Sequence, residues 1–303
     1  MAVRRAARPR SAAAAGWDLL SASPYLLPAL LVFGIFVYFP LGRVIYMSFT
    51  DTDLLSPNPN FVGLRNYSTM LASPDFWFIF RNTAIFAVAV TVIEVILGMG
   101  LGFLMNARTR MQGLVRGAVF APVVVSTAAT ALIWNYVLNP YGGPLNATLR
   151  SAGLPTSGWL SDPDTALATV ILIAVWKGVG LPAVLYLAGL QGIPRELEEA
   201  AVVDGANRWQ IATKITVPML GPTTALVFFI SLAGTFQTYG LVLLLTKGGP
   251  SNATNLLGYY IYQNAFQYFQ MGFASAISVA LFLMLLVIGF VQLKIQESRV
   301  HFQ

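Results

Sequence analysis

Two ionisable side chains, Glu94 and Lys177, lie inside long apolar runs of this sequence. A charged side chain within a membrane-crossing helix is costly, and such residues usually line a ligand pathway or pair with one another. Lys177 precedes Leu190, where its apolar run ends, by 13 residues. That is about 20 Å along a helix, too deep for its ammonium to reach water easily. Two interpretations stay open: the ammonium attracts an anionic ligand, or it forms an intramembrane ion pair with Glu94.

A second group of polar residues consists of hydroxyls within the apolar runs. Ser231, Thr235 and Thr238 are spaced i, i+4 and i+7, which places them on one face of a helix. An earlier run holds Thr127 and Thr130. Such hydroxyls either line a passage for a polar solute or hydrogen-bond between neighbouring helices, which is common in membranes. Taken alone, the spacing favours the second interpretation.

The residue inventory argues against catalytic chemistry. The chain has no cysteine, which excludes a disulfide, a thiolate nucleophile and a zinc–thiolate site. Its single histidine, His301, lies two residues from the end, so neither a Ser–His hydrolase nor a histidine metal site is expected. The sequence also lacks a Gly-x-x-x-x-Gly-Lys-Ser/Thr phosphate loop. We therefore predict no catalytic residue, no bound metal and no cofactor on this chain.

Composition indicates a membrane protein. Only 10% of the 303 residues are charged and 56% are hydrophobic, whereas about 25% charged residues is usual for a soluble domain. Apolar runs of roughly 20 residues are long enough to cross a bilayer as helices. We predict an all-α, polytopic fold with six transmembrane helices at residues 25–49, 83–106, 115–138, 165–190, 223–246 and 272–293.

The distribution of basic residues predicts the orientation. The side that holds both termini carries 12 of the 18 Lys and Arg residues, against five on the other side. Such an excess marks the cytoplasmic face. Residues 1–17 are thus a predicted cytoplasmic tail, residues 18–303 the membrane domain, and both termini are cytoplasmic. The net charge of +6 lies in tails and loops, where anionic lipid explains it better than nucleic acid does.

Local sequence rules predict the structure of the longest predicted cytoplasmic connection, residues 192–218. Pro194 suits the first turn of a helix, and three glutamates follow near the positive end of that helix. Gly205 can adopt the left-handed conformation that ends it. A second helix is predicted over residues 207–216, followed by Pro218. The segment therefore reads as a helix–glycine–helix elbow.

This elbow resembles the EAA loop of the permease subunits of binding-protein-dependent ABC importers. Its residues in register with the pattern Glu-Ala-Ala, three residues, Gly, nine residues, Ile-x-Leu-Pro are Glu199, Ala200, Ala201, Gly205, Ile215 and Pro218, with Val217 in place of Leu. The resemblance implies a type I ABC importer permease fold and an elbow that docks on an ATPase. It assigns the coupling role to Glu199, Ala200, Ala201, Asp204, Gly205 and Pro218.

The resemblance also implies partners and a location. They are a second, similar permease, two copies of an ATPase that binds ATP and magnesium, an external solute-binding protein, and the bacterial plasma membrane. Residues 246–250 and 272–276 resemble the sugar-type permeases in particular. Within that group the chain looks most like the first permease subunits of importers for glycerol-3-phosphate and glycerophosphodiesters.

The family likeness gives the polar residues a role in the substrate pathway. The positions of Lys177 and of the hydroxyls in the fifth predicted helix match positions that face the sugar in maltose-type permeases. A phosphate ester would explain Lys177, and a neutral sugar is the alternative substrate. An ion-coupled secondary transporter, an intramembrane enzyme and a structural membrane protein are more distant alternatives.

Overall fold

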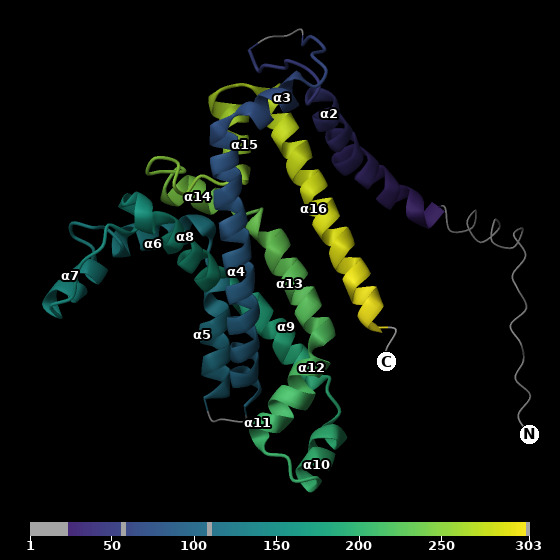
Figure 1. Ribbon diagram of the computed structural model, residues 1–303, viewed down its shortest axis with the longest axis vertical. Helices are drawn as coiled ribbons and strands as arrows, with labels where there is room; N and C mark the ends of the chain where they lie inside the picture. Colours follow the sequence, from purple (N-terminus) through teal and green to yellow (C-terminus); the bar gives the residue numbers. More distant parts are fainter. Residues whose placement is uncertain (1–23, 56–58, 108–110, 301–303) are drawn as a thin grey trace, which may run out of the picture.

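The structure is a computed structural model that describes residues 24–55, 59–107 and 111–300. The predicted cytoplasmic tail, residues 1–17, and His301 lie outside the described residues. Within the described part, extended segments pair only at an isolated antiparallel bridge between Thr50 and Phe61, and helices form the rest of the architecture (Figure 1). The all-α prediction is confirmed.

Three apolar helices are long enough to cross a membrane unbroken. The first, Pro24–Met47, contains the π-helix η1 (Gly34–Tyr38) and α2 (Phe39–Met47). The others are α4 (Pro74–Asn106) and α16 (Met271–Val300). α4 begins earlier than the predicted residue 83, because Ser73 caps it and Pro74 occupies its first turn. Arg81 and Asn82 separate the apolar residues 76–80 from the apolar run that follows, so the prediction began after them.

The other candidate spans are bent pairs of helices, and the third pair includes the second half of the predicted elbow. α5 (Gln112–Val124) and α6 (Thr127–Val137) meet at 100°, and α8 (Pro163–Gly178) and α9 (Gly180–Gln191) meet at 44°. The segment Arg208–Met219 meets α13 (Gly221–Thr235) at 63°. Counting each pair as one span gives the predicted six, but the continuous helices predicted over residues 115–138, 165–190 and 223–246 are wrong.

The break between α5 and α6 has local contributors. Pro122 lies inside α5, where it removes a helical hydrogen bond and crowds the preceding turn. Val125 and Ser126 are then extended, and the Ser126 side chain caps α6 by accepting from Ala129 N. In the fifth predicted span, α13 ends at Thr235. After a turn, the chain continues as α14 (Tyr239–Leu245). In a membrane, such irregular backbone is tolerated only where protein or a cavity surrounds it.

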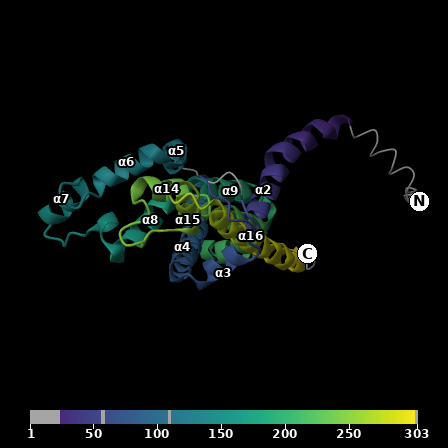
Figure 2. The same cartoon turned by 90° about the horizontal axis from the view of Figure 1, so that it is seen from above.

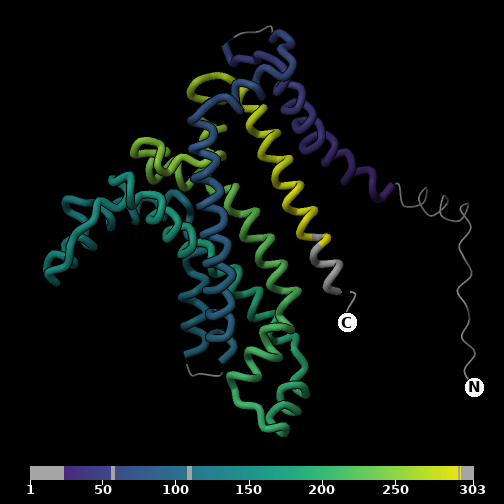
Figure 3. Tube along the Cα trace, in the orientation of Figure 1, coloured from purple at the N-terminus to yellow at the C-terminus, as the bar shows by residue number. Residues whose placement is uncertain are grey.

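α4 is the central helix of the bundle (Figures 1 and 3). It packs against α8, α9 and α13. Its approach to α9 is close because Gly98 and Gly102 face Pro182 and Tyr186: a Cβ atom added to Gly98 would lie 2.6 Å from Pro182 Cβ. Small residues spaced four apart allow this kind of contact between membrane helices.

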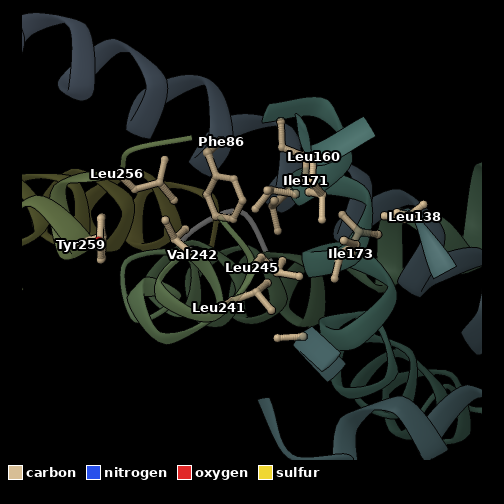
Figure 4. Close-up of a cluster of buried hydrophobic side chains, with 14 of the residues drawn as sticks. Phe86, Leu138, Leu160, Ile171, Ile173, Leu241, Val242, Leu245, Leu256 and Tyr259 are labelled. Carbon is tan, nitrogen blue, oxygen red and sulfur yellow. The ribbon is translucent and has the colours of Figure 1, made fainter. Parts of the chain in front are cut away.

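A buried apolar cluster joins the N-terminal half of α4 to α8 and α14. Phe86 of α4 is fully buried and lies centrally in it (Figure 4). Around it are Ile171 of α8, Val242 of α14, and Tyr259 of α15 (Leu257–Tyr262). This cluster fixes α8 and α14 relative to α4, and all three helices line the pocket described below.

The connections between spans at the end of the molecule that holds α3 (Arg65–Ala72) are called the outer connections below. They also contain the short helices α7 (Pro144–Ser151), η2 (Trp159–Ser161) and η4 (Gln263–Gln267). Asn146 of α7 is buried, donates to the carbonyls of Pro140 and Ser157, and accepts from Trp159 Nε1 at 2.8 Å. Viewed from above, α6 and α7 extend to one side of the bundle and α2 to the other (Figure 2).

The opposite end of the molecule is formed by the 192–218 segment. It contains α10 (Arg195–Val203), α11 (Arg208–Ile211), the π-helix η3 (Ala212–Thr216) and α12 (Val217–Met219). These elements lie far from α3 and α15 (Figure 1), as an elbow on the face away from the outer connections requires.

Candidate functional site

A pocket of about 550 Å³ lies among α4, α8, α13 and α14, beside the break between α5 and α6. It brings together five of the six predicted pathway residues, together with Glu94. Thr130 is the exception: it is fully buried in α6, and its hydroxyl lacks a hydrogen-bond partner among the described residues. The predicted residues that line the pocket are Glu94, Thr127, Lys177, Ser231, Thr235 and Thr238.

Lys177 reaches across the pocket wall to another helix. Its side chain is half-buried in the last turn of α8. Its Nζ donates to the Val125 carbonyl oxygen at 2.5 Å, at the break between α5 and α6. Glu94 lines the same pocket, but Lys177 donates to this carbonyl and not to the Glu94 carboxylate. In this conformation the structure therefore does not form the ion pair considered from the sequence.

Glu94 lies against the break in the fourth span. Its side chain is buried, and its Oε1 packs on Gly178 so closely that any Cβ at Gly178 would collide with it. Ser231 of α13 lies beside this carboxyl, with its own Oγ buried and without a hydrogen-bond partner of good geometry. The bare backbone at Gly178 is thus what lets a carboxyl group enter the pocket wall.

The hydroxyls of the fifth span share the pocket, although they do not share one helix. Thr235 Oγ1 donates to Leu232 O at 2.6 Å, and Thr238 Oγ1 donates to Gly234 O at 3.2 Å. Each hydroxyl donates its proton to a backbone carbonyl, so its oxygen can still accept a hydrogen bond. All three predicted hydroxyls line one pocket, but the single helix on which they were expected to share a face is wrong, because α13 ends at Thr235 and Thr238 belongs to the turn before α14.

Two polar pocket residues were not predicted. Gln237 lines the pocket from the turn between α13 and α14, and Tyr239 lines it from the first position of α14. Both side chains are exposed. The prediction from the sequence covered only the hydroxyls at positions 231, 235 and 238 of this span and did not consider these two side chains. The one signal available was the amide of Gln237 inside an apolar run.

The elbow has the predicted helix–glycine–helix geometry. α10 ends at Asp204, and Gly205 has φ +83°. Gly205 N donates to Val202 O at 3.0 Å and Ala206 N donates to Ala201 O at 2.9 Å, the pair of bonds that closes a helix with a left-handed residue. Immediately after, Asn207 and Gln210 cap each other's backbone and start α11. The turn is thus closed on both sides.

The second half of the elbow differs from the prediction. The single helix expected over residues 207–216 is α11 followed by η3, and Pro218 lies within α12 rather than ending the helix. A proline is tolerated there because it occupies the first turn of α12, where its missing N–H costs little. The chain bends only after Met219.

The predicted coupling residues divide into two groups by exposure. Glu199, Ala200, Asp204 and Pro218 are exposed, so a partner can reach them. Ala201 is buried and faces the chain itself. A groove of about 530 Å³ lies between the elbow and the end of α4, and it is lined by Phe103, Glu198, Glu199, Val202, Arg208, Ile211, Ala212 and Thr216.

Comparison with known proteins identifies the family. The model for the binding-protein-dependent transport system inner membrane component matches residues 94–301. The multiple sugar-binding transport system permease protein of Streptococcus mutans is 32% identical over 274 residues, covering 90% of this chain and 94% of that protein. The sn-glycerol-3-phosphate transport system permease protein of Agrobacterium fabrum is 32% identical over 285 residues, covering 92% and 96%.

A solved structure of an ABC transporter has a similar fold. A chain from a bacterial ABC transporter involved in the import of the acidic polysaccharide alginate has a TM-score of 0.81 and 25% identity, covering 94% of this chain and 98% of that one. The expected type I importer fold is therefore confirmed. The family match begins at Glu94 and includes the pocket residues of α8 and α13 as well as the elbow. This chain belongs to the binding-protein-dependent transport system inner membrane components, the permease subunits of ABC transporters.

Proposed function

We propose that this chain is one of two permease subunits of an ABC importer and passes a small, hydroxyl-rich solute across the bacterial plasma membrane. The observation that carries the proposal is the pocket of about 550 Å³. It is lined by hydroxyls, an amide, a carboxyl and an ammonium at the level where three spans are broken. A few placed polar groups in a largely apolar wall are typical of a small-molecule site.

The elbow supplies the link to a motor in this proposal. Glu199 and Ala200 are exposed at the end of the molecule opposite the outer connections. Two ATPase subunits, which bind ATP and magnesium, would dock there and move the elbow when they close. The bundle would then open toward an external binding protein that delivers the solute, and hydrolysis would reset it. This chain itself performs no catalysis.

This mechanism requires a particular orientation. The elbow and both termini lie on the cytoplasmic side in the proposal, and the connections containing α3, α7 and α15 face the external binding protein. The excess of Lys and Arg on the elbow side supports this arrangement, because basic loops remain in the cytoplasm. A second permease completes the pathway.

Two classes of solute fit the pocket. A phosphate ester such as glycerol-3-phosphate or a glycerophosphodiester is favoured by the Lys177 ammonium and by the relative from Agrobacterium fabrum. A neutral sugar is favoured by the hydroxyls beside the buried Glu94 carboxyl, which would repel an anion if ionised, and by the relative from Streptococcus mutans. Both solutes share the hydroxyl groups that Thr235, Thr238 and Gln237 can bind.

Purification from the native membrane tests the proposal. Subunit masses should reveal a second permease, an ATPase and an external protein. Calorimetry on that external protein with glycerol-3-phosphate, glycerophosphocholine and neutral mono- and disaccharides identifies the solute. Uptake into proteoliposomes should then require internal ATP and survive an uncoupler. Uptake that continues without ATP and stops with the uncoupler contradicts the proposal and indicates an ion-coupled transporter.

A further inference from the structure

The broken third and fourth spans meet at Lys177. The third breaks between α5 and α6, and the fourth breaks at Val179, between α8 and α9. Gly180, the first residue of α9, lies directly on α5: a Cβ atom there would be 2.7 Å from Val119 O and 2.7 Å from Val123 Cγ2. The two breaks are therefore in contact.

The break in the third span exposes a carbonyl that needs a donor. Val125 has an extended backbone (φ −65°, ψ 132°) and ends α5. In an unbroken helix its carbonyl would accept from Ala129 N, but Ala129 N donates to Ser126 Oγ at 3.2 Å instead. A backbone carbonyl without a donor at membrane depth is costly. Lys177 Nζ supplies that donor.

The C-terminal end of α5, at Val125, is electrostatically favourable for a cation. The last carbonyls of a helix carry a partial negative charge that stabilises cations. Lys177 is in the last turn of α8 and reaches the C-terminal end of α5, so two helix ends act on one ammonium. Of the charged side chains lining the pocket, Glu94 is the other, and it packs on Gly178, the residue after Lys177.

We infer that Lys177 is a positioning residue: it holds the 100° break between α5 and α6 through the Val125 carbonyl and so fixes the wall of the pocket. The inference rests on the proposed function, because the pocket matters only if a solute passes there. Thr127, the first residue of α6, lines the pocket two residues beyond Val125. The positioning role does not depend on the charge of the solute, so uptake of a neutral solute depends on Lys177 as well.

The absence of cysteine from the chain makes a direct structural test practical. Leu114→Cys on α5 and Tyr136→Cys on α6 place two spin labels on exposed positions, 68% and 70% exposed, either side of the break. The labelled complete complex in lipid nanodiscs gives the distance distribution between α5 and α6 by pulsed electron resonance. The measurement is made with Lys177, Lys177→Met, Lys177→Arg and, as a control, Lys247→Met.

We expect Lys177→Met to shift and broaden the distribution, and Lys177→Arg, which keeps a charged donor, to restore the native one. Lys247 lies in the outer connection, and its substitution should change nothing. An unchanged distribution in Lys177→Met overturns the inference. So does a shifted one that Lys177→Arg does not restore.

The test also gives an answer when a variant does not assemble and when the complex does not import. If Lys177→Met does not assemble, Lys177→Leu, which also lacks a donor, replaces it with the same expected broadening. If neither assembles, recovery in Lys177→Arg supports the inference and failure in Lys177→Arg overturns it. Because the readout is a distance, a complex that proves not to import by ATP hydrolysis contradicts the proposed function and leaves the distance result standing.

Discussion

Gly102 of α4 meets Tyr186 of α9 so closely that a Cβ atom on the glycine would lie 2.7 Å from Tyr186 Cβ. Tyr186 is fully buried, so it cannot move aside. Gly102→Leu should therefore force α4 and α9 apart, and overpacking of this kind costs about 1–3 kcal/mol or more. Thermal unfolding of the purified complex measures the loss.

Gly100 provides the matched control for this prediction. It lies in the same helix, and an added Cβ would meet nothing within 4 Å. Gly100→Leu should therefore leave the unfolding temperature close to that of the native complex. Equal losses in the two variants would contradict the prediction, because Gly100→Leu makes no contact with α9.

Gly205 is expected to be necessary for coupling. Its φ of +83° is unfavourable for any residue with a Cβ, at a cost of about 1–2 kcal/mol. Gly205→Val should distort the turn between α10 and α11 and lower solute-stimulated ATP hydrolysis and uptake together. Gly192 lies in the same segment with φ −82°, so Gly192→Ala should retain both activities. Normal stimulation in Gly205→Val would contradict a coupling role for the elbow geometry.

The elbow and the pocket differ in how far the sequence predicts them. Gly205 acts on its own neighbours, so a local rule predicted the turn correctly, whereas Pro194, expected in the first turn of α10, is the residue before that helix. The six apolar runs were also visible, because bilayer thickness sets their length. The breaks at Ser126, Val179 and Phe236 were not, since lipid-embedded helices often contain proline or glycine without bending sharply. Packing against neighbouring helices decides whether a proline or glycine bends the helix sharply.

The pocket depends on contacts between residues distant in the chain. Glu94 and Gly178 lie in different spans, and nothing in either run indicates that one fills the space left by the other. Lys177 was recognised as unusual, but its partner is a backbone carbonyl at Val125, and sequence patterns do not reveal free carbonyls. The hydroxyls were grouped correctly, except that Thr130 faces the protein interior.

Asp51 should report on the outer connection through its titration. The Asn60 side-chain amide donates to Asp51 Oδ2 at 3.1 Å and the Asn60 backbone amide donates to Oδ1 at 2.5 Å, and these bonds lower the pKa of the Asp51 carboxyl below its usual value. Because the folded pKa is the lower one, the bonds stabilise the connection above the unfolded pKa. Their contribution is lost as pH falls through the folded pKa.

Carbon NMR of the Asp51 carboxyl measures this effect directly. Asn60→Ala removes the side-chain donor and should raise the pKa of Asp51, whereas Asp53→Asn, which leaves both donors to Asp51 in place, should not change it. A pKa for Asp51 that is the same with and without the Asn60 amide would contradict the assigned cause.

Thr238 offers the sharpest test of the pocket as a solute site. Its Oγ1 donates to Gly234 O and lines the pocket, so its oxygen can accept a hydrogen bond from a solute hydroxyl. Thr238→Val keeps the shape and removes that acceptor. A hydrogen bond contributes about 1 kcal/mol, so the half-saturating solute concentration for uptake should rise roughly 5-fold. Thr130→Val makes the same chemical change in α6, at a buried hydroxyl outside the pocket, and should leave that concentration unchanged. If both valine variants raise it equally, the effect is on helix packing and Thr238 does not meet the solute.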